Sequence, residues 1–577
     1  MKLLIVGGYG IFGGRVVELL ENEPRLTLVV AGRSLAKARA YCAGRGRAAA
    51  HIVPACFDRD GDLAAQLAAI RPDILVDASG PFQAYGAGSH RVIEACIAGG
   101  INYLDLADGS DFVAGVGAFD AAARRAGVYV LSGVSSFPVL TAAVVRRLAA
   151  GMARVESIRG GIAPSPYAVV GGNVIRAIAS YAGQPVRLTR DGRAAKGHPF
   201  TEQLRYTVEP PGCLPLRSTL FSLVDVPDLR ALAELWPEAK TIWMGAGPVP
   251  EGLHRALIAL AWLVRLRLLP SLLPLAPLMS LATNRLSWGE HRGGMFVEVA
   301  GRDAAGAPCK RSWHMLAEGD DGPLIPSMAV EALVRKALGG QAPAAGARAA
   351  VCDLELEDYE KLFAGRRIVA ATRDDSVPQT APLYRRVLGS AWESLPPEIR
   401  VLHDLAGAAS AEGRATVERG RGLLARLIAT VIGFPKAAAD TPIRVGFEAA
   451  RGGETWTRTF GGRSFASRQC AGRGRSEGLL CERFGPLTFA IALLPVDAKL
   501  KLVLRRWSAF GLPLPLWLCP RSNAYETAAE GRFHFHVEIT HPLTGLIVRY
   551  RGWLLPAHRA SVAPAPGQAT TLSPENA

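Results

Sequence analysis

The first 130 residues alternate two hydrophobic patterns. Short runs of consecutive apolar residues are separated by segments in which apolar residues recur every three or four positions, as at Val16, Val17 and Leu20. Strands buried on both faces produce the first pattern, and amphipathic helices produce the second. The runs expected to form strands are residues 3–6, 26–31, 51–57, 73–78, 102–106 and 128–132. Strands that alternate with helices predict a parallel, doubly wound sheet.

The pattern changes in the C-terminal third of the chain. Residues 383–405 and 423–432 have a helical pattern, and alternation of apolar and polar residues begins at Ile443. The segments expected as strands are 443–447, 456–460, 487–492, 500–504, 533–539 and 547–553. Because short strands with glycine-rich turns follow one another closely, we expect a strongly curved or closed antiparallel sheet.

A glycine-rich turn joins the first strand to the first helix. Residues 7–14 read Gly-Gly-Tyr-Gly-Ile-Phe-Gly-Gly and contain the spacing Gly-x-Gly-x-x-Gly from Gly8. In a strand–turn–helix context these glycines allow a sharp turn, a close approach of backbone N–H groups to a pyrophosphate, and tight packing of helix on strand. The N-terminus of the helix adds unpaired donors and a partial positive charge. A dinucleotide is therefore expected at Gly8, Tyr9, Gly10, Ile11, Phe12 and Gly13.

The end of the second strand indicates which dinucleotide binds. An NAD site usually carries Asp or Glu here for the ribose 2′-OH, whereas this chain has Gly32-Arg33-Ser34. A guanidinium and a hydroxyl suit a 2′-phosphate, which a carboxylate would repel. We expect NADP(H) rather than NAD(H), with Arg33 and Ser34 at the phosphate; an exposed loop arginine is the alternative.

The ends of the third, fourth and fifth strands supply the remaining candidate residues. Asp58 follows the third strand, and the fourth ends in Ser79-Gly80-Pro81-Phe82, where the chain must pass the ribose and nicotinamide. Hydride transfer needs a proton donor nearby. The candidates for this role are Tyr85, Asp105 and Asp108. The alternatives are a turn or cap role for Asp108 beside Gly109 and a core role for Tyr85.

Five motif blocks together resemble the NADP-binding form of the saccharopine dehydrogenase-like oxidoreductases, over about residues 1–350. They are the glycine turn, Gly80-Pro81-Phe82-x-x-Tyr85-Gly86, Ala95-Cys96-Ile97-x-x-Gly100, Tyr103-x-Asp105-Leu106-Ala107-Asp108-Gly109 and Ser135-Ser136-x-Pro138. The resemblance implies a mixed α/β second domain, inserted before the chain returns to finish the nucleotide domain. Residues 295–299 and 309–316 are similar to a hairpin of that second domain, and 327–338 to the returning helix.

Three later blocks resemble a bacterial domain of unknown function, family 4166, over about residues 383–556. They are Leu388-Gly389-x-x-Trp392, Trp456-x-Arg458-x-Phe460-Gly461-Gly462 and His541-Pro542-Leu543-Thr544-Gly545-Leu546. This resemblance implies no particular chemistry.

The expected fold class is α/β: a Rossmann doubly wound parallel sheet with an inserted mixed α/β second domain, plus a C-terminal α+β domain dominated by a curved antiparallel sheet. The expected domains are 1–135 with 322–340 for NADP, 136–321 as second domain for substrate or dimer contacts, 341–382 as linker, 383–556 as C-terminal sheet domain, and 557–577 as a disordered tail. A length of 577 residues and 49% apolar composition fit several folded domains.

Cysteine and histidine usage excludes the common metal sites. The nine cysteines are scattered without a CxxC, which argues against a disulfide framework or a zinc site and fits a cytoplasmic protein. His534, His536 and Glu538 share one strand face but spread over about 13 Å, too far for one metal ion. We therefore expect no metal. A first strand that begins at the N-terminus leaves no room for a signal peptide.

Charge bears on the partners. The net charge is +15, of which +10 lies from Leu383 onward. Because these arginines are dispersed, we expect no nucleic acid, and an anionic lipid surface or acidic ligand is the alternative. Residues 257–282 are leucine-rich but contain two central arginines and three prolines, which disfavour a membrane span. A peripheral membrane segment, an apolar substrate wall and a buried or homodimer-forming helix pair remain open.

These observations predict an NADP(H)-dependent oxidoreductase that acts on a small, hydrophobic substrate. Saccharopine carries several carboxylates and is not expected to react. The alternative is a non-catalytic dinucleotide-binding scaffold or redox sensor with a lipid- or partner-binding C-terminal domain. A small closed sheet can hold one apolar ligand, which suits either hypothesis.

Overall fold

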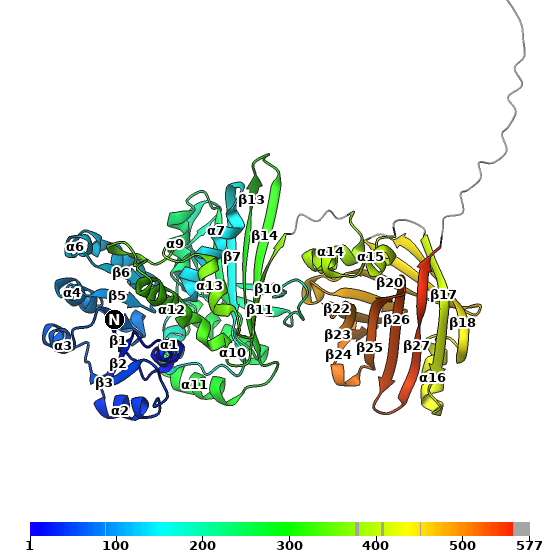
Figure 1. The fold of residues 1–577 in the computed structure, drawn as a ribbon, viewed down its shortest axis with the longest axis horizontal. Coiled ribbons are helices and arrows are strands. Elements are labelled where there is room, and N and C mark those ends of the chain that lie inside the picture. The colour runs from blue at the N-terminus through cyan, green and yellow to red at the C-terminus, as the bar shows by residue number, and fades with distance from the viewer. Residues whose placement is uncertain (87, 375–379, 406–408, 451, 558–577) are drawn as a thin grey trace, which may run out of the picture. The chain divides into compact units, whose positions relative to one another are not determined.

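The protein is described from a computed structural model that covers residues 1–86, 88–374, 380–405, 409–450 and 452–557. The chain divides into two compact units, Met1–Val377 and Pro378–Ala577 (Figure 1). The expected tail lies, apart from Ala557, outside the described residues.

The first unit contains a parallel seven-stranded sheet in the order β15-β6-β5-β4-β1-β2-β3. Its strands are β1 (Lys2–Val6), β2 (Thr27–Gly32), β3 (His51–Cys56), β4 (Ile74–Asp77), β5 (Asn102–Asp105), β6 (Tyr129–Ser132) and β15 (Gly346–Ala349). This order confirms the doubly wound sheet. The strand order reverses between the neighbouring strands β1 and β4. In open α/β sheets, ligands bind in the crevice at the carboxyl ends of the two strands where the order reverses.

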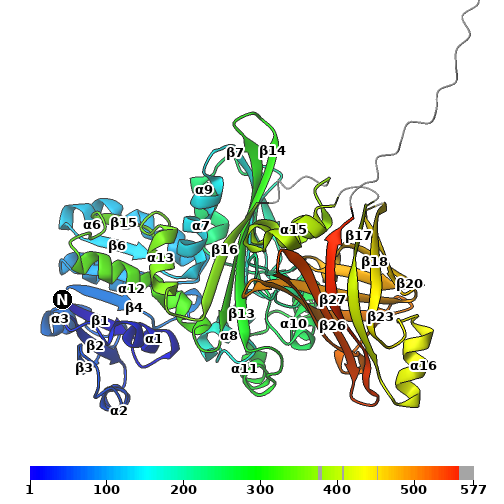
Figure 2. The ribbon, with the colours of Figure 1, turned by 45° about the vertical axis from the view of Figure 1, so that its right-hand side comes forward.

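Alternate residues of β1 pack against different helices. Leu3 and Ile5 belong to the core formed with α1 and α12, whereas Leu4 and Val6 belong to the core formed with α3, α4 and α6. Figures 1 and 2 show these helices on the two faces of the sheet. They are α1 (Ile11–Leu20), α12 (Ile325–Leu338), α3 (Leu63–Ile70), α4 (Arg91–Ala98) and α6 (Asp120–Ala126); α2 (Leu35–Ala43) and α5 (Ser110–Gly115) complete the domain. Burial of the sheet on both faces explains the continuous apolar runs.

The interval expected as a linker contains regular structure. Strand β15 pairs with β6, and β16 (Ile368–Asp374) pairs with β14, with α13 (Leu356–Phe363) between them in sequence. In β15 the residues Gly-Ala-Arg-Ala lack β-branched side chains, so composition alone resembles a loop. The Asp120 carboxylate accepts a hydrogen bond from the N–H of Ala347, which anchors this strand. Residues 375–379 of the interval lie outside the described residues.

The inserted domain is built on a mixed sheet in the order β10-β11-β12-β7-β13-β14-β16. Its remaining strands are β7 (Met152–Ala163), β10 (Gln203–Tyr206), β11 (Thr219–Leu223), β12 (Thr241–Ala246), β13 (Arg292–Asp303) and β14 (Pro308–Glu318), and β8 (Val186–Arg190) pairs with β9 (Arg193–Gly197). The antiparallel pair β13–β14, in register at Met295 and Met315, confirms the expected hairpin. One continuous core joins this domain to the α1 and α12 side of the parallel sheet.

Five further helices accompany the inserted domain. They are α7 (Thr141–Ala149), α8 (Gly172–Tyr181), α9 (Asp228–Leu235), α10 (Glu251–Arg265) and α11 (Ala276–Arg285). The leucine-rich segment 257–282 thus forms most of α10 and the first part of α11. Within the described residues, no helix combines the length and apolar character needed to cross a membrane.

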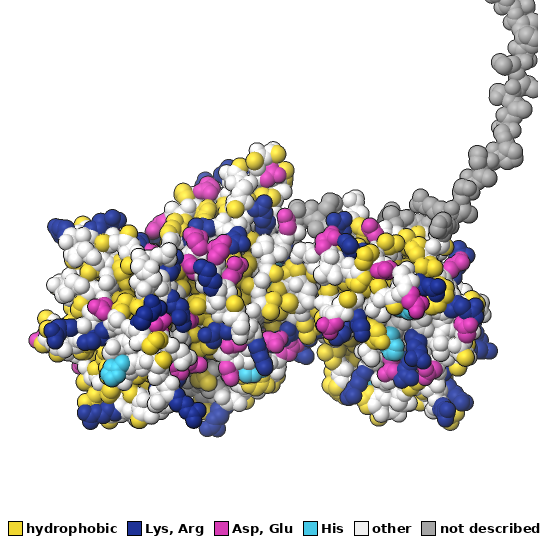
Figure 3. All heavy atoms as spheres, viewed as in Figure 1, with side chains coloured by type: hydrophobic (Ala, Val, Ile, Leu, Met, Phe, Trp, Pro, Cys, Tyr) yellow, Lys and Arg dark blue, Asp and Glu magenta, His cyan; other side chains and the backbone are white. Residues whose placement is uncertain are grey.

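The second unit is an antiparallel barrel. Its eleven-stranded sheet runs β22-β21-β20-β19-β18-β17-β27-β26-β25-β23-β24, and pairing of β22 with β23 closes it. The strands are β17 (Ala409–Arg419), β18 (Ala438–Ala450), β19 (Gly453–Phe460), β20 (Arg463–Ala471), β21 (Leu480–Phe484), β22 (Leu487–Val496), β23 (Lys499–Ala509), β24 (Leu512–Leu514), β25 (Arg521–Ala529), β26 (Arg532–His541) and β27 (Gly545–Pro556). Closure confirms the curved sheet. Figure 3 shows acidic and basic side chains interspersed on the displayed face of each unit.

Two local predictions for the second unit have different outcomes. The single helix expected over 383–405 is interrupted: α14 (Leu383–Leu388) and α15 (Pro397–His403) are separated at Gly389, where φ is 57°, and at Pro396. By contrast, α16 (Leu423–Val431) matches its expected range.

On β26, Glu538 pairs with Arg549, and His536 stacks on Tyr525. The described residues contain no cluster suited to a metal ion.

Candidate active site

A cavity of about 1320 Å³ lies in the first unit, between the carboxyl edge of the parallel sheet and helices α8, α10 and α11. One end is lined by the glycine turn after β1 and the loop after β4. The other end is lined by one face of each helix, for example Ile175 and Ile178 of α8, Leu257 of α10 and Met279 of α11. The cavity therefore joins the crevice of the parallel sheet to an apolar chamber.

The glycine turn has the geometry that a bound pyrophosphate requires. Tyr9, Gly10, Ile11 and Phe12 line the cavity, while Gly8 and Gly13 lie behind it. A Cβ atom on Gly13 would lie 2.3 Å from the carbonyl oxygen of Gly7, so only glycine fits between turn and helix. A Cβ on Gly10 would lie 3.0 Å from the same oxygen. The turn leaves the N-terminus of α1 open to the cavity.

Arg33 and Ser34 differ in their surroundings. Arg33 is exposed and lines the cavity. The Ser34 hydroxyl instead caps α2 by accepting a hydrogen bond from the Lys37 N–H (3.3 Å). The backbone N–H of Ser34 donates to the Tyr9 hydroxyl. Asp58 does not line the cavity, and its carboxylate accepts a hydrogen bond from the Asp60 N–H. The structure thus brings Arg33, but neither Ser34 nor Asp58, to the wall.

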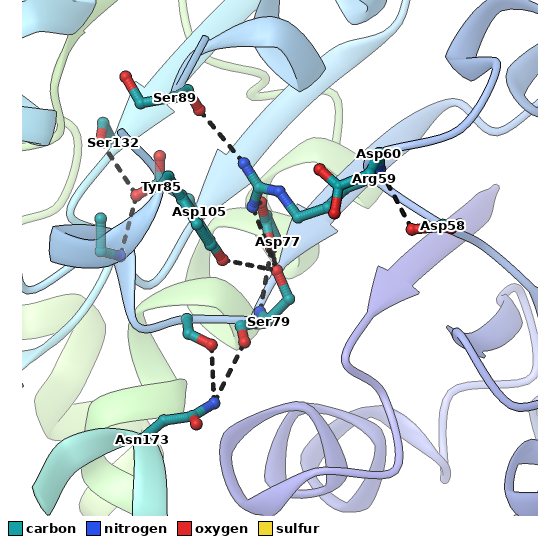
Figure 4. Close-up of polar contacts among 12 residues, drawn as sticks. Asp58, Arg59, Asp60, Asp77, Ser79, Tyr85, Ser89, Asp105, Ser132 and Asn173 are labelled. Carbon is teal, nitrogen blue, oxygen red and sulfur yellow. Dashed lines mark hydrogen bonds and ion pairs between the residues drawn. The ribbon is translucent and has the colours of Figure 1, made fainter. Parts of the chain in front are cut away.

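Arg59, which the sequence analysis did not identify, occupies the position expected for Asp58. Its guanidinium donates to Asp77 (3.1 Å), to the Ser79 hydroxyl (3.3 Å) and to the Ser89 carbonyl, and lies 3.4 Å from the centre of the Tyr85 ring (Figure 4). Asp77 is buried and does not line the cavity, and its ion pair holds the lining guanidinium of Arg59 in place. In the sequence, the only indication of this role is that a basic residue directly follows Asp58 at the end of the third strand.

The loop after β4 is held from two sides. The Ser79 hydroxyl donates to Asp77 (2.5 Å), and the amide of Asn173 on α8 donates to the Gly80 carbonyl (2.7 Å). Ser79, Gly80, Pro81 and Phe82 all line the cavity, and the Gly80–Pro81 peptide is cis. Figure 4 shows Asn173 reaching this loop from the inserted domain.

The three candidate proton donors are not equivalent. Tyr85 lines the cavity, but its hydroxyl is bonded to Ser79 (2.9 Å), and burial together with Asp77 raises its pKa. Asp105 is fully buried away from the cavity wall. One of its oxygens accepts hydrogen bonds from Ala107, Ser132 and Gly133, and burial raises its pKa to about 7. Asp105 therefore holds the turn after β5 against β6.

Asp108 lies on the cavity wall next to a second carboxyl group. It accepts a hydrogen bond from the Gln83 amide (3.1 Å), and burial and Asp225 raise its pKa. Asp225 also lines the cavity and accepts a hydrogen bond from Ser110 (2.5 Å). Both carboxyl groups interact electrostatically with Tyr181 of α8 and contribute to the raised pKa of its hydroxyl. A carboxyl group with a raised pKa keeps its proton to a higher pH than an ordinary aspartic acid and can donate it to a substrate.

His254 of α10 is a further polar group on the chamber wall. One ring nitrogen is 2.8 Å from the Ser222 hydroxyl. Burial lowers its pKa to about 4, so the ring is neutral at physiological pH. Asp225, Tyr181 and His254 come from the inserted domain, in which the motifs mark none of these three residues, so the sequence could not place them at the site.

Two family models match the chain. Residues 3–131 match the saccharopine dehydrogenase NADP-binding domain, and residues 395–554 match a domain of unknown function, DUF4166. The matches confirm both resemblances and identify the first 131 residues as a nicotinamide-dinucleotide-binding domain. A search of curated proteins finds no match to the chain.

Several solved structures resemble the chain over part of its length. Apo saccharopine dehydrogenase (L-Glu forming) from Saccharomyces cerevisiae is 14% identical, over 64% of this chain and 99% of its own, with a TM-score of 0.46. Biliverdin reductase from Synechocystis, in complex with biliverdin and NADP⁺, is 14% identical over 62% and 94%, with a TM-score of 0.28. The WlbA dehydrogenase from Thermus thermophilus, in complex with NAD and α-ketoglutarate, is 12% identical over 60% and 90%, with a TM-score of 0.27.

Proposed function

We propose that the protein is an NADP(H)-dependent oxidoreductase that transfers a hydride between the nicotinamide and a hydrophobic small molecule. The observation that carries this proposal is the cavity itself, which continues from the glycine turn into an apolar chamber with a protonatable carboxyl group on its wall.

The residues at the first end of the cavity fit a dinucleotide. The open turn at Gly10 and the N-terminus of α1 suit the pyrophosphate, and the exposed guanidinium of Arg33 suits the 2′-phosphate. The bound cofactor would supply or accept the hydride. The loop Ser79–Phe82, fixed by Asp77 and Asn173, would position the nicotinamide end.

Asp108 is the residue that we assign as proton donor. It lies on the cavity wall, burial and Asp225 favour its protonated form, and Gln83 orients its carboxyl group. Reduction of a carbonyl or imine would move its proton to the substrate oxygen or nitrogen, and oxidation would return it. Tyr85 would position Arg59 and the loop rather than donate.

The chamber favours an apolar substrate. Of the described lysine and arginine residues, those on the cavity wall are Arg15, Arg33, Arg59 and Arg91, all in the dinucleotide-binding domain. Among the described residues, none that lines the chamber side carries a cationic side chain, since His254 is neutral. A substrate with several carboxylates, such as saccharopine, would therefore bury unpaired charges.

Stopped-flow loss of NADPH absorbance with a panel of long-chain aldehydes, imines and enones tests this function. We expect turnover with at least one long-chain member, tighter binding of NADPH than NADH, and no turnover with saccharopine or its precursors. Tight NADPH binding without turnover of any member would favour the non-catalytic scaffold or sensor. Failure to bind either dinucleotide would exclude both.

A further inference from the structure

The chamber opens to solvent through an apolar mouth. Val169, in the loop 164–171 after β7, is 63% exposed and yet lines the cavity, and Leu278 of α11 is 62% exposed and does the same. Side chains that line a cavity and are also more than half exposed lie at its opening. The mouth is therefore between this loop and α11.

Further exposed apolar side chains surround this opening. Hydrogen bonds join Val170 to Asn284 in both directions, and the Tyr167 hydroxyl donates to the Gly289 carbonyl, so loop 164–171 lies beside residues 284–289. The exposed apolar residues on these adjoining segments, which we call the mouth patch, are Tyr167, Val169, Leu278, Leu281, Leu286 and Trp288. A contiguous exposed apolar patch marks an interaction surface.

The charged residues of the helical segment that carries most of the mouth patch have one sign, while the exposed Asp320 pairs with His291 beside Tyr167. Residues 252–289 contain four arginines and neither aspartate nor glutamate. Arg255 pairs with Glu251 and Arg265 donates to Thr201, but the exposed side chains of Arg267 and Arg285 bond to no described residue. Such a combination of exposed leucine, tryptophan and arginine suits the interface of an anionic bilayer, where apolar side chains enter the acyl region and arginines contact phosphates.

We propose that the mouth patch docks on an anionic phospholipid bilayer, so that the substrate enters the chamber directly from the membrane. This inference rests on the proposed function, because only a hydrophobic substrate needs such a route. Charge favours a lipid surface over a second copy of this chain, since a symmetric contact would place like-charged arginines together. A protein partner on the patch would cover the mouth that the substrate must pass.

Vesicle sedimentation of the full-length protein tests the docking directly. The probes are vesicles of phosphatidylcholine alone and of phosphatidylcholine mixed with phosphatidylglycerol. We expect binding to the mixed vesicles, at least tenfold weakened in the double variant Leu281→Ser, Trp288→Ser, whose residues do not line the cavity. Arg267→Gln with Arg285→Gln should weaken it by roughly fivefold per arginine and remove the preference for anionic lipid.

A matched control changes equally exposed apolar residues elsewhere. Val369→Ser with Val401→Ser should leave vesicle binding unchanged, since these side chains are 49% and 52% exposed outside the patch. Equal binding by the wild type and the patch variants, or a change of oligomeric state in light scattering instead, would overturn the proposal.

Turnover separates this proposal from the proposed function. The patch variants should retain turnover of a short, water-soluble substrate and lose it for the same reactive group on a vesicle-embedded chain. Loss of vesicle binding by the patch variants with no difference between the two substrates would refute entry from the membrane. Absence of NADPH turnover in every protein would refute the proposed function, while vesicle binding would still report on docking.

Discussion

Asp105 and Asp108 lie three residues apart, yet only one of them reaches the cavity. Asp105 ends β5 with its side chain turned into the core, where Ser132 and the backbone N–H groups of Ala107 and Gly133 bond to one of its oxygens. Asp108 follows the turn and meets Gln83 on the cavity wall. The motif predicts that both residues lie near the sheet edge, but which carboxyl group faces the ligand depends on the path of the turn.

Replacing Asp225 with asparagine should lower the pKa of Asp108, because one negative neighbour is removed. The proton donor must be protonated, so the rate of carbonyl reduction falls as pH rises through its pKa. In Asp225→Asn the rate should therefore begin to fall at a lower pH than in the wild type. Asp108→Asn should lower kcat by about 10²–10⁴-fold and abolish this pH dependence. A pH profile of kcat measures both effects. The exposed Asp191→Asn, away from the cavity wall, serves as control, and an Asp108→Asn variant with an unchanged profile would remove Asp108 from the mechanism.

Arg33→Glu should weaken NADPH binding by about 10–100-fold and leave NADH binding largely unchanged, because only NADPH carries the 2′-phosphate that Arg33 would contact. Fluorescence titration with both dinucleotides measures this selectivity. Arg39→Glu makes the same charge change on an exposed position of α2 away from the cavity wall. Equal losses in the two variants would indicate a general charge effect and refute a specific phosphate contact.

At the scale of elements, Gly13 couples the turn to the packing of α1 on β1. Gly13→Ala would place a Cβ atom against the Gly7 carbonyl and the Gly8 Cα, so the helix must move away from the strand. We expect a loss of about 1–3 kcal/mol in stability of the first unit and weaker NADPH binding. Thermal unfolding and titration measure these. Gly46→Ala, where a Cβ would meet nothing within 4 Å, should change neither, and a neutral Gly13→Ala would contradict the packing role.

Sequence patterns predicted the elements that carry strong local signals. The apolar runs located β1 to β6, and the alternation located most of the barrel, because burial of a strand on one or both faces constrains its composition directly. Strand β15 was missed because its register is set by β6 and Asp120 rather than by its own small residues. The predicted helix over 383–405 failed because Gly389 and Pro396 interrupt it.

The same distinction applies to the candidate site. Glycines and loop residues that follow strands were predictable because topology brings strand ends together. Asp225 and His254 were not predictable, because their positions depend on how the inserted domain packs over the sheet. Arg59 was not predictable because the sequence does not show which residue of the loop after β3 points into the cavity.

At the scale of the whole molecule, the second unit contains a buried ion pair inside its barrel. The alternation of apolar and polar residues along the strand already places the arginine of this pair on the inward face. Arg458 has the same strand parity as the buried Trp456 and Phe460, and its guanidinium donates to Glu482 (3.0 Å) and to the Ser467 hydroxyl (2.8 Å). It also lies over the Trp456 ring, 5.1 Å from its centre. The barrel interior is therefore organised around a charge that must remain paired.

Removing one member of this pair should destabilise the second unit alone. Either Arg458→Met or Glu482→Gln leaves the other group buried without its partner, a situation that typically costs about 3–5 kcal/mol, whereas the double variant Arg458→Met, Glu482→Leu should recover much of that loss. Because the chain forms two compact units, denaturant unfolding should show one transition shifted and NADPH affinity unchanged. Arg414→Met, which breaks an exposed pair with Asp440, should shift neither transition. A common shift of both transitions would instead mean that the two units unfold as one.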